Sequence, residues 1–323
     1  MGYLALDGPF RPCSRILGWW DRTVPGTALG AALIFLAECH LVGRLCRAAG
    51  IDMAVYAEAH GIGDVLPGRW RRVAADECAG DAALSVLAGM ASVGEIYACA
   101  DWPAYQALSA ELAGTHNAWP ETPRISYDST LYVQALWRRL GAMVYLRCAP
   151  ALQAWADGVL HRHCGERPVV ALHLKNVPNG TGASNARQAV WHTFLNTATE
   201  NYGTGFLLIG DDRVEARISG LPGVLSARAI GADSFSRHLA LLMQADAFMG
   251  MMSGPCNGAI FSDKPYAIFK HPDHHRDEML SEIGDQDHYC FAQPGQRVLR
   301  VEETPEILLA ELARMPFLLG GEA

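Results

Sequence analysis

Short apolar runs alternate with polar, glycine-containing turns along this chain, and the alternation predicts strands and helices in succession. In the N-terminal half, residues 16–20 and 51–57 predict buried strands on either side of an apolar helix at about 27–49, which Gly50 caps. The C-terminal half shows the pattern more clearly. Its apolar runs, each followed by helical periodicity, begin at Val169 and span 206–210, 224–229, 247–250 and 266–269.

The segments between these runs predict further helices and one further strand. The helices are expected at 82–91, 103–112, 128–140, 149–164, 186–198, 212–219, 234–244, 256–262 and 305–315, and the strand at 95–99. Residues 117–124 contain two prolines and predict a loop. Strands that alternate with helices imply right-handed parallel crossovers. The predicted fold class is therefore α/β, with two Rossmann-like, doubly wound domains that face a central cleft.

The polar step at residues 165–168 is the expected domain boundary, because a predicted helix ends there and a buried strand begins. We therefore expect an N-terminal Rossmann-like domain over residues 1–164 and a C-terminal one over residues 165–304. A closing helix would occupy residues 305–323. Trp19 and Trp20 are expected in the core of the first domain.

The composition predicts a packed globular protein that does not bind nucleic acid. Half of the 323 residues are hydrophobic, and 34 acidic against 26 basic residues give a net charge of −8. A nucleic-acid surface needs an excess of Lys and Arg, whereas a local positive pocket for a small anion remains compatible with this balance. The nine cysteines are odd in number and lack CxxC spacing, which predicts reduced thiols and a cytoplasmic location.

The apolar run at residues 28–37 predicts a buried helix and not a membrane span. It is roughly half the length of a span and is expected to stop at Glu38. The N-terminus lacks the pattern of a signal peptide. We therefore expect no membrane anchor.

The first strand of the C-terminal half ends in a polar tip that predicts phosphate binding. His173, Lys175 and Asn176 follow the apolar run, and a loop with Gly180 and Gly182 leads into a predicted helix. The start of a helix offers unpaired N–H groups and a partial positive charge. Lys175 adds a full charge, and Asn176 adds an amide donor.

Two further strand ends carry polar groups, namely the Gly210-Asp211-Asp212 segment and the serine turn at residues 253–257. Because the carboxyl ends of parallel strands meet at one edge of a sheet, we expect the three tips to converge on one diphosphate. Either aspartate would accept hydrogen bonds from a base or a ribose, and main-chain N–H groups would bind phosphate. The expected donor-binding residues are Lys175, Asn176, Gly180, Thr181, Gly182, Ser184, Gly210, Asp211, Asp212, Ser253, Gly254, Pro255, Cys256 and Asn257.

Segments 171–183, 206–212 and 238–259 resemble the GT-B glycosyltransferases, in particular the GDP-fucose-dependent α-1,6 and protein O-linked fucosyltransferases. The similarity consists of His-x-basic, a Leu-rich strand ending in Asp-Asp, and Leu-x-x-Ala-Asp-x-Phe-x-Gly-x-x-Ser. Members of that family typically carry His-x-Arg-Arg, where an arginine holds the donor phosphates. The motif here is His173-Leu174-Lys175-Asn176, which keeps one charge without the bidentate fork. The Ser253-Gly254-Pro255 turn is also similar to the phosphate-binding turn of heptosyltransferases.

The resemblance implies a metal-independent sugar transfer without a cofactor. In GT-B enzymes the first domain usually holds the acceptor and the second holds the donor. The protein stabilises the leaving diphosphate, and a carboxylate or histidine deprotonates the acceptor hydroxyl. His173 and Asp21 are the candidate catalytic residues. The expected partners are a nucleoside diphosphate sugar and a carbohydrate or glycoconjugate acceptor, with the sugar and the base left open.

Other interpretations remain at this point. A sugar-nucleotide epimerase of the same fold and a non-catalytic binding or scaffold protein both fit the pattern. Asp211 and Asp212 also suit the N-terminal cap of a helix. His271, His274 and His275 suggest a metal site, but their spacing matches no recognised metal motif.

Overall fold

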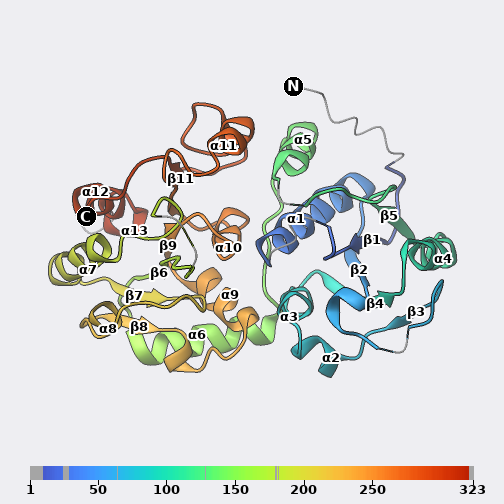
Figure 1. Ribbon diagram of the computed structural model, residues 1–323, viewed down its shortest axis with the longest axis horizontal. Helices are drawn as coiled ribbons and strands as arrows, with labels where there is room; N and C mark the ends of the chain where they lie inside the picture. The colour runs from blue at the N-terminus through green and yellow to red at the C-terminus, as the bar shows by residue number, and fades with distance from the viewer. Residues whose placement is uncertain are drawn as a thin grey trace. The chain divides into compact units, whose positions relative to one another are not determined.

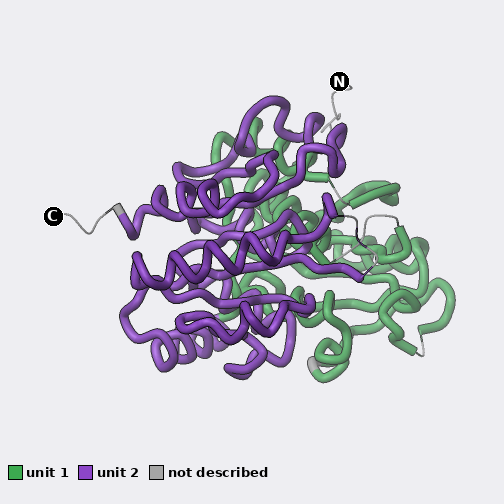
Figure 2. The backbone as a smooth tube through the Cα atoms, turned by 60° about the vertical axis from the view of Figure 1, so that its left-hand side comes forward, with its two compact units in different colours: residues 1–149 green, residues 150–323 purple. Residues whose placement is uncertain are grey.

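The computed structural model describes residues 10–24, 29–63, 65–127, 129–178, 180 and 182–319. The chain forms two compact units, residues 1–149 and 150–323, each built on its own β-sheet (Figures 1 and 2). The second unit begins with helix α6 (Pro150–Cys164), the helix that was expected to close the first domain. It also includes the C-terminal helices.

The first unit carries a five-stranded sheet of order β3-β4-β2-β1-β5. All strands are parallel except β3, which pairs antiparallel with β4 at the edge. Its elements are β1 (Arg15–Trp20), α1 (Leu29–Cys46), β2 (Gly50–Tyr56), a 3₁₀ turn (Glu58–His60), β3 (Trp70–Arg72), α2 (Ala75–Ala79), α3 (Ala82–Ala88), β4 (Val93–Cys99), α4 (Trp102–Leu112), β5 (His116–Trp119) and α5 (Leu131–Leu140).

Strand β3 and helix α2 were not predicted, and two predictions for the first unit are wrong. Gly50 is the first residue of β2 and not a helix cap. The segment predicted as a loop begins with the end of β5, which pairs with β1 from Arg15 to Gly18 and ends at the cis peptide bond before Pro120. The chain order places β5 on the far side of β1 from β2, so Asp21 follows the strand at which the winding of the sheet reverses.

Helix α1 is a core helix of the first unit. Among the described helices it is the one long and apolar enough to cross a membrane, yet 78% of it is buried inside the protein. Glu38 does not stop it, because the Glu38 carboxylate accepts from Trp119 Nε1 and pairs with Arg124. Burial raises the pKa of Glu38 to about 7, against the opposing effects of Arg124 and Trp119. Trp19 and Trp20 are buried, as expected.

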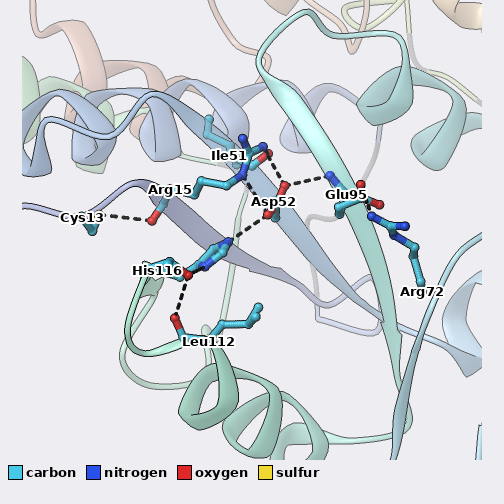
Figure 3. Close-up of polar contacts among 9 residues, drawn as sticks. Cys13, Arg15, Ile51, Asp52, Arg72, Glu95, Leu112 and His116 are labelled. Carbon is cyan, nitrogen blue, oxygen red and sulfur yellow. Dashed lines mark hydrogen bonds and ion pairs between the residues drawn. The ribbon is translucent and has the colours of Figure 1, made fainter.

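A closed polar network joins four strands near their amino ends (Figure 3). Asp52 of β2 is 2% exposed and accepts from Arg15 Nε at 2.8 Å and Nη2 at 2.7 Å. It also accepts from His116 Nε2 at 2.8 Å and from the Glu95 N–H at 2.7 Å. Burial alone would raise the pKa of Asp52, but these donors outweigh it and the pKa is lowered. The network therefore fastens the sheet.

The second unit carries a six-stranded parallel sheet of order β11-β10-β9-β6-β7-β8. After α6 its elements are β6 (Val169–His173), α7 (Gln188–Tyr202), β7 (Gly205–Leu208), α8 (Ala216–Ser219), β8 (Val224–Ser226), a 3₁₀ turn (Arg228–Ile230), α9 (Phe235–Gln244), β9 (Ala247–Met251), α10 (Cys256–Ile260), β10 (Tyr266–Phe269), α11 (Arg276–Ile283), β11 (Gln296–Leu299), α12 (Pro305–Ala313) and α13 (Pro316–Leu319).

This strand order is that of a Rossmann fold, with the winding reversing between β6 and β9. Helices α7 and α12 cover one face of the sheet, where Trp191 and Phe194 pack beside Leu308 and Leu312. Helix α9 packs against both α6 and α10. Ligands of such sheets bind at the carboxyl ends of the strands at the reversal, so the ends of β6 and β9 are where a site is expected.

Candidate functional site

His173 is the last residue of β6 and lies in the centre of the sheet of the second unit. It is 2% exposed and pairs in register with Gly250 of β9. A Cβ atom at Gly250 would lie 2.5 Å from the carbonyl oxygen of His173, so glycine is required there for the two strands to approach. The backbone at the reversal is therefore fixed by close packing.

The imidazole of His173 pairs with Asp212. His173 Nε2 lies 3.1 Å from Asp212 Oδ2, and the other carboxylate oxygen accepts from the Asn176 N–H at 3.0 Å. Burial lowers the pKa of His173 to about 4, although Asp212 opposes the shift. The ring is thus neutral at pH 7, and the approach of Nε2 to Asp212 favours the tautomer with the proton on Nε2. Its Nδ1 is a buried acceptor with no hydrogen-bond partner among the described residues.

A second buried histidine, His238 of α9, fixes the turn that carries Asp212. Its Nδ1 accepts from the Gly210 N–H at 2.9 Å, and its Nε2 donates to the Ala232 carbonyl at 3.1 Å. Gly210 adopts φ +89°, and a Cβ there would lie 3.3 Å from His173 Nε2. Burial lowers the pKa of His238, which keeps it an acceptor. The role of His238 has no local signal in the sequence, because its partners Gly210 and Ala232 are not adjacent to it along the chain.

The two consecutive aspartates have different surroundings. Asp211 forms an ion pair with Arg228 at 2.6 Å, and both side chains are more than 70% exposed. Asp212 contacts His173 and the backbone of Asn176. Helix α8 begins only at Ala216, after an N-cap at Glu215, so neither aspartate caps it. Of the two aspartates, Asp212 is the one that contacts the buried His173.

The glycine loop after β6 is folded on itself. The Asn185 side chain accepts from the Val177 N–H at 3.0 Å and donates to the Val177 carbonyl at 2.9 Å, and Asn176 Nδ2 donates to the Arg213 carbonyl at 2.6 Å. A Cβ at Gly180 would lie 2.6 Å from Asn185 Oδ1. Gly182 has open space around it, and Ser184 is 9% exposed. Thr181 lies outside the described residues.

The helix after this loop has another partner at its start. Helix α7 begins at Gln188, and the N–H of its N-cap residue Arg187 donates to Glu303 Oε1 at 3.2 Å. The same oxygen accepts from Trp191 Nε1 at 3.4 Å, and Glu303 is 2% exposed. A carboxylate from a distant part of the chain thus occupies this end of the helix. The expectation that the N–H groups there are unpaired is wrong for Arg187.

The serine turn after β9 also satisfies most of its own donors. The N–H groups of Cys256 and Asn257 donate to the carbonyls of Ser253 and Gly254 at 3.2 and 3.3 Å. The Ser253 N–H donates to Cys256 Sγ at 3.3 Å, and Asn257 Nδ2 donates to the Gly254 carbonyl at 3.4 Å. Pro255 has no N–H. Within the described chain, the Gly254 N–H is the one N–H donor of this turn without a recorded acceptor.

Two lysines flank the end of β9. His173, Gly250 and Ile268 form one row across β6, β9 and β10, and Lys175 and Lys270 each lie two residues beyond that row. Strands two apart are separated by about 10 Å, so both long side chains can reach the same anion. Among the described residues no carboxylate comes within ion-pair distance of either ammonium. Lys270 was not predicted as a site residue, because the sequence alone does not show that β10 lies beside β9.

Lysine is rare in this protein, which makes the pair more informative. Only three of the 26 Lys and Arg residues are lysines, and the third, Lys264, precedes β10 at the opposite end of that strand. Burial and then Lys175 lower the pKa of Lys270. Both ammonium groups also act on the buried thiol of Cys256, whose pKa burial raises to about 12. Positive charge is thus concentrated at the carboxyl ends of β6, β9 and β10.

Asp21 follows β1 in the first unit. Its Oδ1 accepts from the Thr23 N–H at 2.9 Å and from Thr23 Oγ1 at 2.6 Å. Glu58 and Asp101, which follow β2 and β4, share its surroundings, because the pKa of Tyr56 is raised first by its hydrogen bond to Glu58 and also by the charges of Asp21 and Asp101. The carboxyl edge of this sheet is therefore acidic, in contrast to that of the second unit.

Among the described residues no group of three or more His, Cys, Asp or Glu side chains is arranged to hold a metal ion. His271 and His275 pair instead with the carboxylates of Glu302 and Glu278, at 3.3 and 3.4 Å. The metal interpretation of the 271–275 segment therefore has no structural support.

Comparison with known proteins identifies the fold. No family model and no curated protein matches the sequence. A family 9 glycosyl transferase from Veillonella parvula matches with a TM-score of 0.52 and 9% identity, over 93% of this chain and 89% of the other. The E. coli heptosyltransferase WaaC with ADP gives 0.51 and 13%, over 92% and 98%. The E. coli ADP-heptose LPS heptosyltransferase II gives 0.52 and 14%, over 96% and 100%.

At these identities the likeness establishes the fold. The chain has the GT-B glycosyltransferase fold, with two Rossmann-like domains built on parallel sheets. The predicted α/β fold class and the predicted GT-B fold are thus confirmed.

Proposed function

We propose that this protein is a glycosyltransferase that moves a sugar from a nucleoside diphosphate sugar to an acceptor hydroxyl. The observation that carries the proposal is the pair of ammonium groups, Lys175 and Lys270, on either side of β9 in a unit with Rossmann topology. Phosphate oxygens are the natural partners of two lysines that have no carboxylate within reach. The Gly254 N–H supplies a further donor at the same strand ends.

In this scheme the charge that develops on the leaving diphosphate is stabilised by groups already in place. Lys175 and Lys270 neutralise it, and no reorganisation is needed at the moment of transfer. His173 contributes the lone pair of Nδ1, which can accept a hydrogen bond from a hydroxyl group of the nucleotide sugar. Burial keeps that ring neutral, and Asp212, 3.1 Å from Nε2, orients it.

The acceptor belongs, in this proposal, to the first unit. Asp21 follows the strand at the reversal of that sheet, and among the described residues Thr23 is the one that donates hydrogen bonds to its carboxylate. A carboxylate in that position is suited to take the proton of an acceptor hydroxyl. The acceptor would be a carbohydrate or glycoconjugate, and transfer would need no metal, so activity should persist in a chelator.

The donor nucleotide to test first is ADP. One of the matching structures is WaaC with ADP, and another is the same enzyme with ADP-2-deoxy-2-fluoro heptose. GDP is the alternative from the fucosyltransferase resemblance of segments 171–183 and 238–259. We also propose a cytoplasmic location, which the lack of any disulfide among the nine cysteines supports.

Calorimetry with ADP, GDP and UDP tests the proposal. Lys175→Ala and Lys270→Ala should each weaken binding of the preferred nucleotide by about 1.5–3 kcal/mol, the value of a charged hydrogen bond. Lys264→Ala is the matched control and should bind as the wild type does, because Lys264 lies at the amino end of β10. Unchanged affinity in both site variants, or no binding by any nucleoside diphosphate, would contradict the proposal.

Product analysis with a labelled donor then separates transfer from epimerisation. Transfer gives a labelled acceptor and free nucleoside diphosphate. A donor whose sugar is inverted without transfer would instead support the epimerase.

A further inference from the structure

Lys270 differs from an ordinary lysine in its surroundings. It follows β10 directly, is 7% exposed, and its N–H donates to the Leu299 carbonyl at 2.9 Å. No described carboxylate lies within 4.0 Å of its ammonium group. Because burying an unpaired ammonium is costly, these surroundings lower the pKa of Lys270.

The charged and titratable groups that act on Lys270 come from three parts of the second unit, namely the segment after β6 and helices α10 and α11. Burial has the largest effect on its pKa, and the ammonium of Lys175, beyond β6, lowers it further. Cys256 of α10 and Glu278 and Glu282 of α11 act in the opposite direction without reversing the result. A lysine that is desolvated and beside a second cation has more of its amine unprotonated at neutral pH, and the unprotonated amine is the nucleophile.

The loop after Lys270 adds a neutral base to the same neighbourhood. The pKa of His274 is lowered to about 4 by burial and then by the positive charges of Lys270, His275, Lys175 and His271. At pH 7 the His274 ring is therefore unprotonated, so it adds no charge and can accept a proton.

We propose that Lys270 is a nucleophilic amine that forms an imine with small aldehydes carrying a phosphate group, which Lys175 holds. This rests on the proposed function only in assigning a phosphate to Lys175. The register places the two side chains at equal distances beyond one row of the sheet, on either side of β9. One ligand can therefore meet an anion-binding ammonium and a reactive amine together.

The chemistry balances without a further reagent. The Nζ lone pair of Lys270 attacks the carbonyl carbon, the π electrons move to oxygen, and a proton passes from nitrogen to that oxygen to give a carbinolamine. Loss of water then forms the C=N bond. The sum is one amine and one aldehyde giving one imine and one water molecule.

Pyridoxal 5′-phosphate is a suitable probe, because its aldehyde and phosphate belong to one small molecule. The full-length protein would be incubated with limiting probe at pH 7.5, reduced with borohydride, and analysed by peptide mass spectrometry. With three lysines in the chain, Lys264 serves as the internal control. Pyridoxal without the phosphate, used on the wild type, tests the role of the phosphate without any substitution.

We expect Lys270 to be modified at least about tenfold faster than Lys264 with the phosphate probe, and this preference to fall sharply with pyridoxal. Lys175→Ala should slow modification of Lys270, because it removes both the phosphate ligand and the neighbouring cation. Lys270→Arg should abolish the modification at this position while its thermal unfolding stays close to that of the wild type. Prior addition of the nucleotide found by calorimetry should protect Lys270.

Two results would overturn the inference. Equal or greater modification of Lys264 would show that Lys270 is not specially reactive, and equal rates with pyridoxal would show that no phosphate is held beside it. Nucleotide binding without selective modification leaves the proposed function standing and refutes this inference. Selective modification without binding of any nucleoside diphosphate does the reverse.

Discussion

Each unit has one polar cluster that combines cationic side chains with a histidine and an aspartate, namely the Asp52 cluster in the first unit and the His173 cluster in the second. The charges are paired in the Asp52 cluster and are not all paired in the His173 cluster. In the first unit, at the amino ends of the strands, both carboxylate oxygens of Asp52 accept hydrogen bonds, from Arg15, His116 and the Glu95 N–H (Figure 3). In the second unit, at the carboxyl ends, no described carboxylate lies within ion-pair distance of Lys175 or Lys270.

The difference indicates that the Asp52 cluster stabilises the fold, whereas the His173 cluster is suited to bind a ligand. A cluster whose charges are all paired has no charge available for a ligand, and disruption of the cluster should lower the free energy of unfolding. A cluster with excess positive charge and an unpartnered acceptor, His173 Nδ1, costs stability until a ligand completes it. The strand ends at which the second cluster lies are also those at which Rossmann-like sheets bind their ligands.

The largest expected change in stability follows from a substitution in the Asp52 cluster, whose charges are all paired. Asp52→Asn removes the charge that Arg15 and His116 share, and the free energy of unfolding should fall by about 2–4 kcal/mol. Urea denaturation measures this loss. Arg72→Ala, which breaks only the exposed pair with Glu95, is the control and should cost less than about 0.5 kcal/mol. A loss below about 1 kcal/mol in Asp52→Asn would mean that the network does not fasten the sheet.

The two clusters should respond to acid in different pH windows. The pKa of His173 is about 4 in the folded protein against 6.5 ordinarily, so between these values the unfolded chain binds more protons. The free energy of unfolding should therefore fall as the pH drops from 6.5 to 4, by about 1–3 kcal/mol for this group. His40, with a pKa of about 4, adds to the fall. Asp52, whose pKa is lowered, contributes stability that is lost only below its ordinary value of 3.8.

Urea denaturation at pH 7 and pH 5 tests this assignment. His173→Gln should lose less stability between the two pH values than the wild type does, because the substituted side chain does not titrate. An equal loss in both proteins would remove His173 from the explanation.

A substitution in the His173 cluster, which contains the unpaired ammonium group of Lys270, should change stability in the opposite direction. Lys270→Met keeps the apolar stem and removes a buried, unpaired ammonium, so the protein should become more stable by about 0.5–2 kcal/mol while nucleotide binding weakens. Thermal unfolding without ligand measures the gain. If the variant is destabilised, Lys270 has a stabilising partner and the contrast between the clusters fails.

The smallest expected effect distinguishes the two aspartates. Asp211→Ala breaks only the exposed pair with Arg228 and should change stability by less than about 0.5 kcal/mol, with nucleotide affinity unaltered. Asp212→Ala should weaken nucleotide binding, because it releases His173 and the Asn176 backbone. Equal effects of the two substitutions on affinity would contradict the assignment of Asp212 to the site.

Local sequence carried much of the architecture. The apolar runs at 16–20 and 51–57 and the run that begins at Val169 predicted β1, β2 and β6, because a buried parallel strand needs a continuous apolar segment and a turn after it. The three polar tips of the second unit were likewise visible as polar groups directly after such runs. Strand β5 was missed since it has only four residues and is followed by prolines.

Other features depended on which segments became neighbours. Lys270 joins Lys175 because β10 and β6 both lie beside β9, and His238 reaches the Gly210 turn from α9. Glu303 closes the start of α7 from 116 positions away along the chain. None of these pairs has a local signature.

The sequence by itself therefore determined the alternation of strands and helices and the residue types at each strand end. Both follow from short-range preferences for burial and turn formation. The tertiary structure alone decided which charges are paired and which are left for a ligand. Charge pairing depends on distances of a few ångströms between residues far apart in the chain, and only the packed sheet sets those distances.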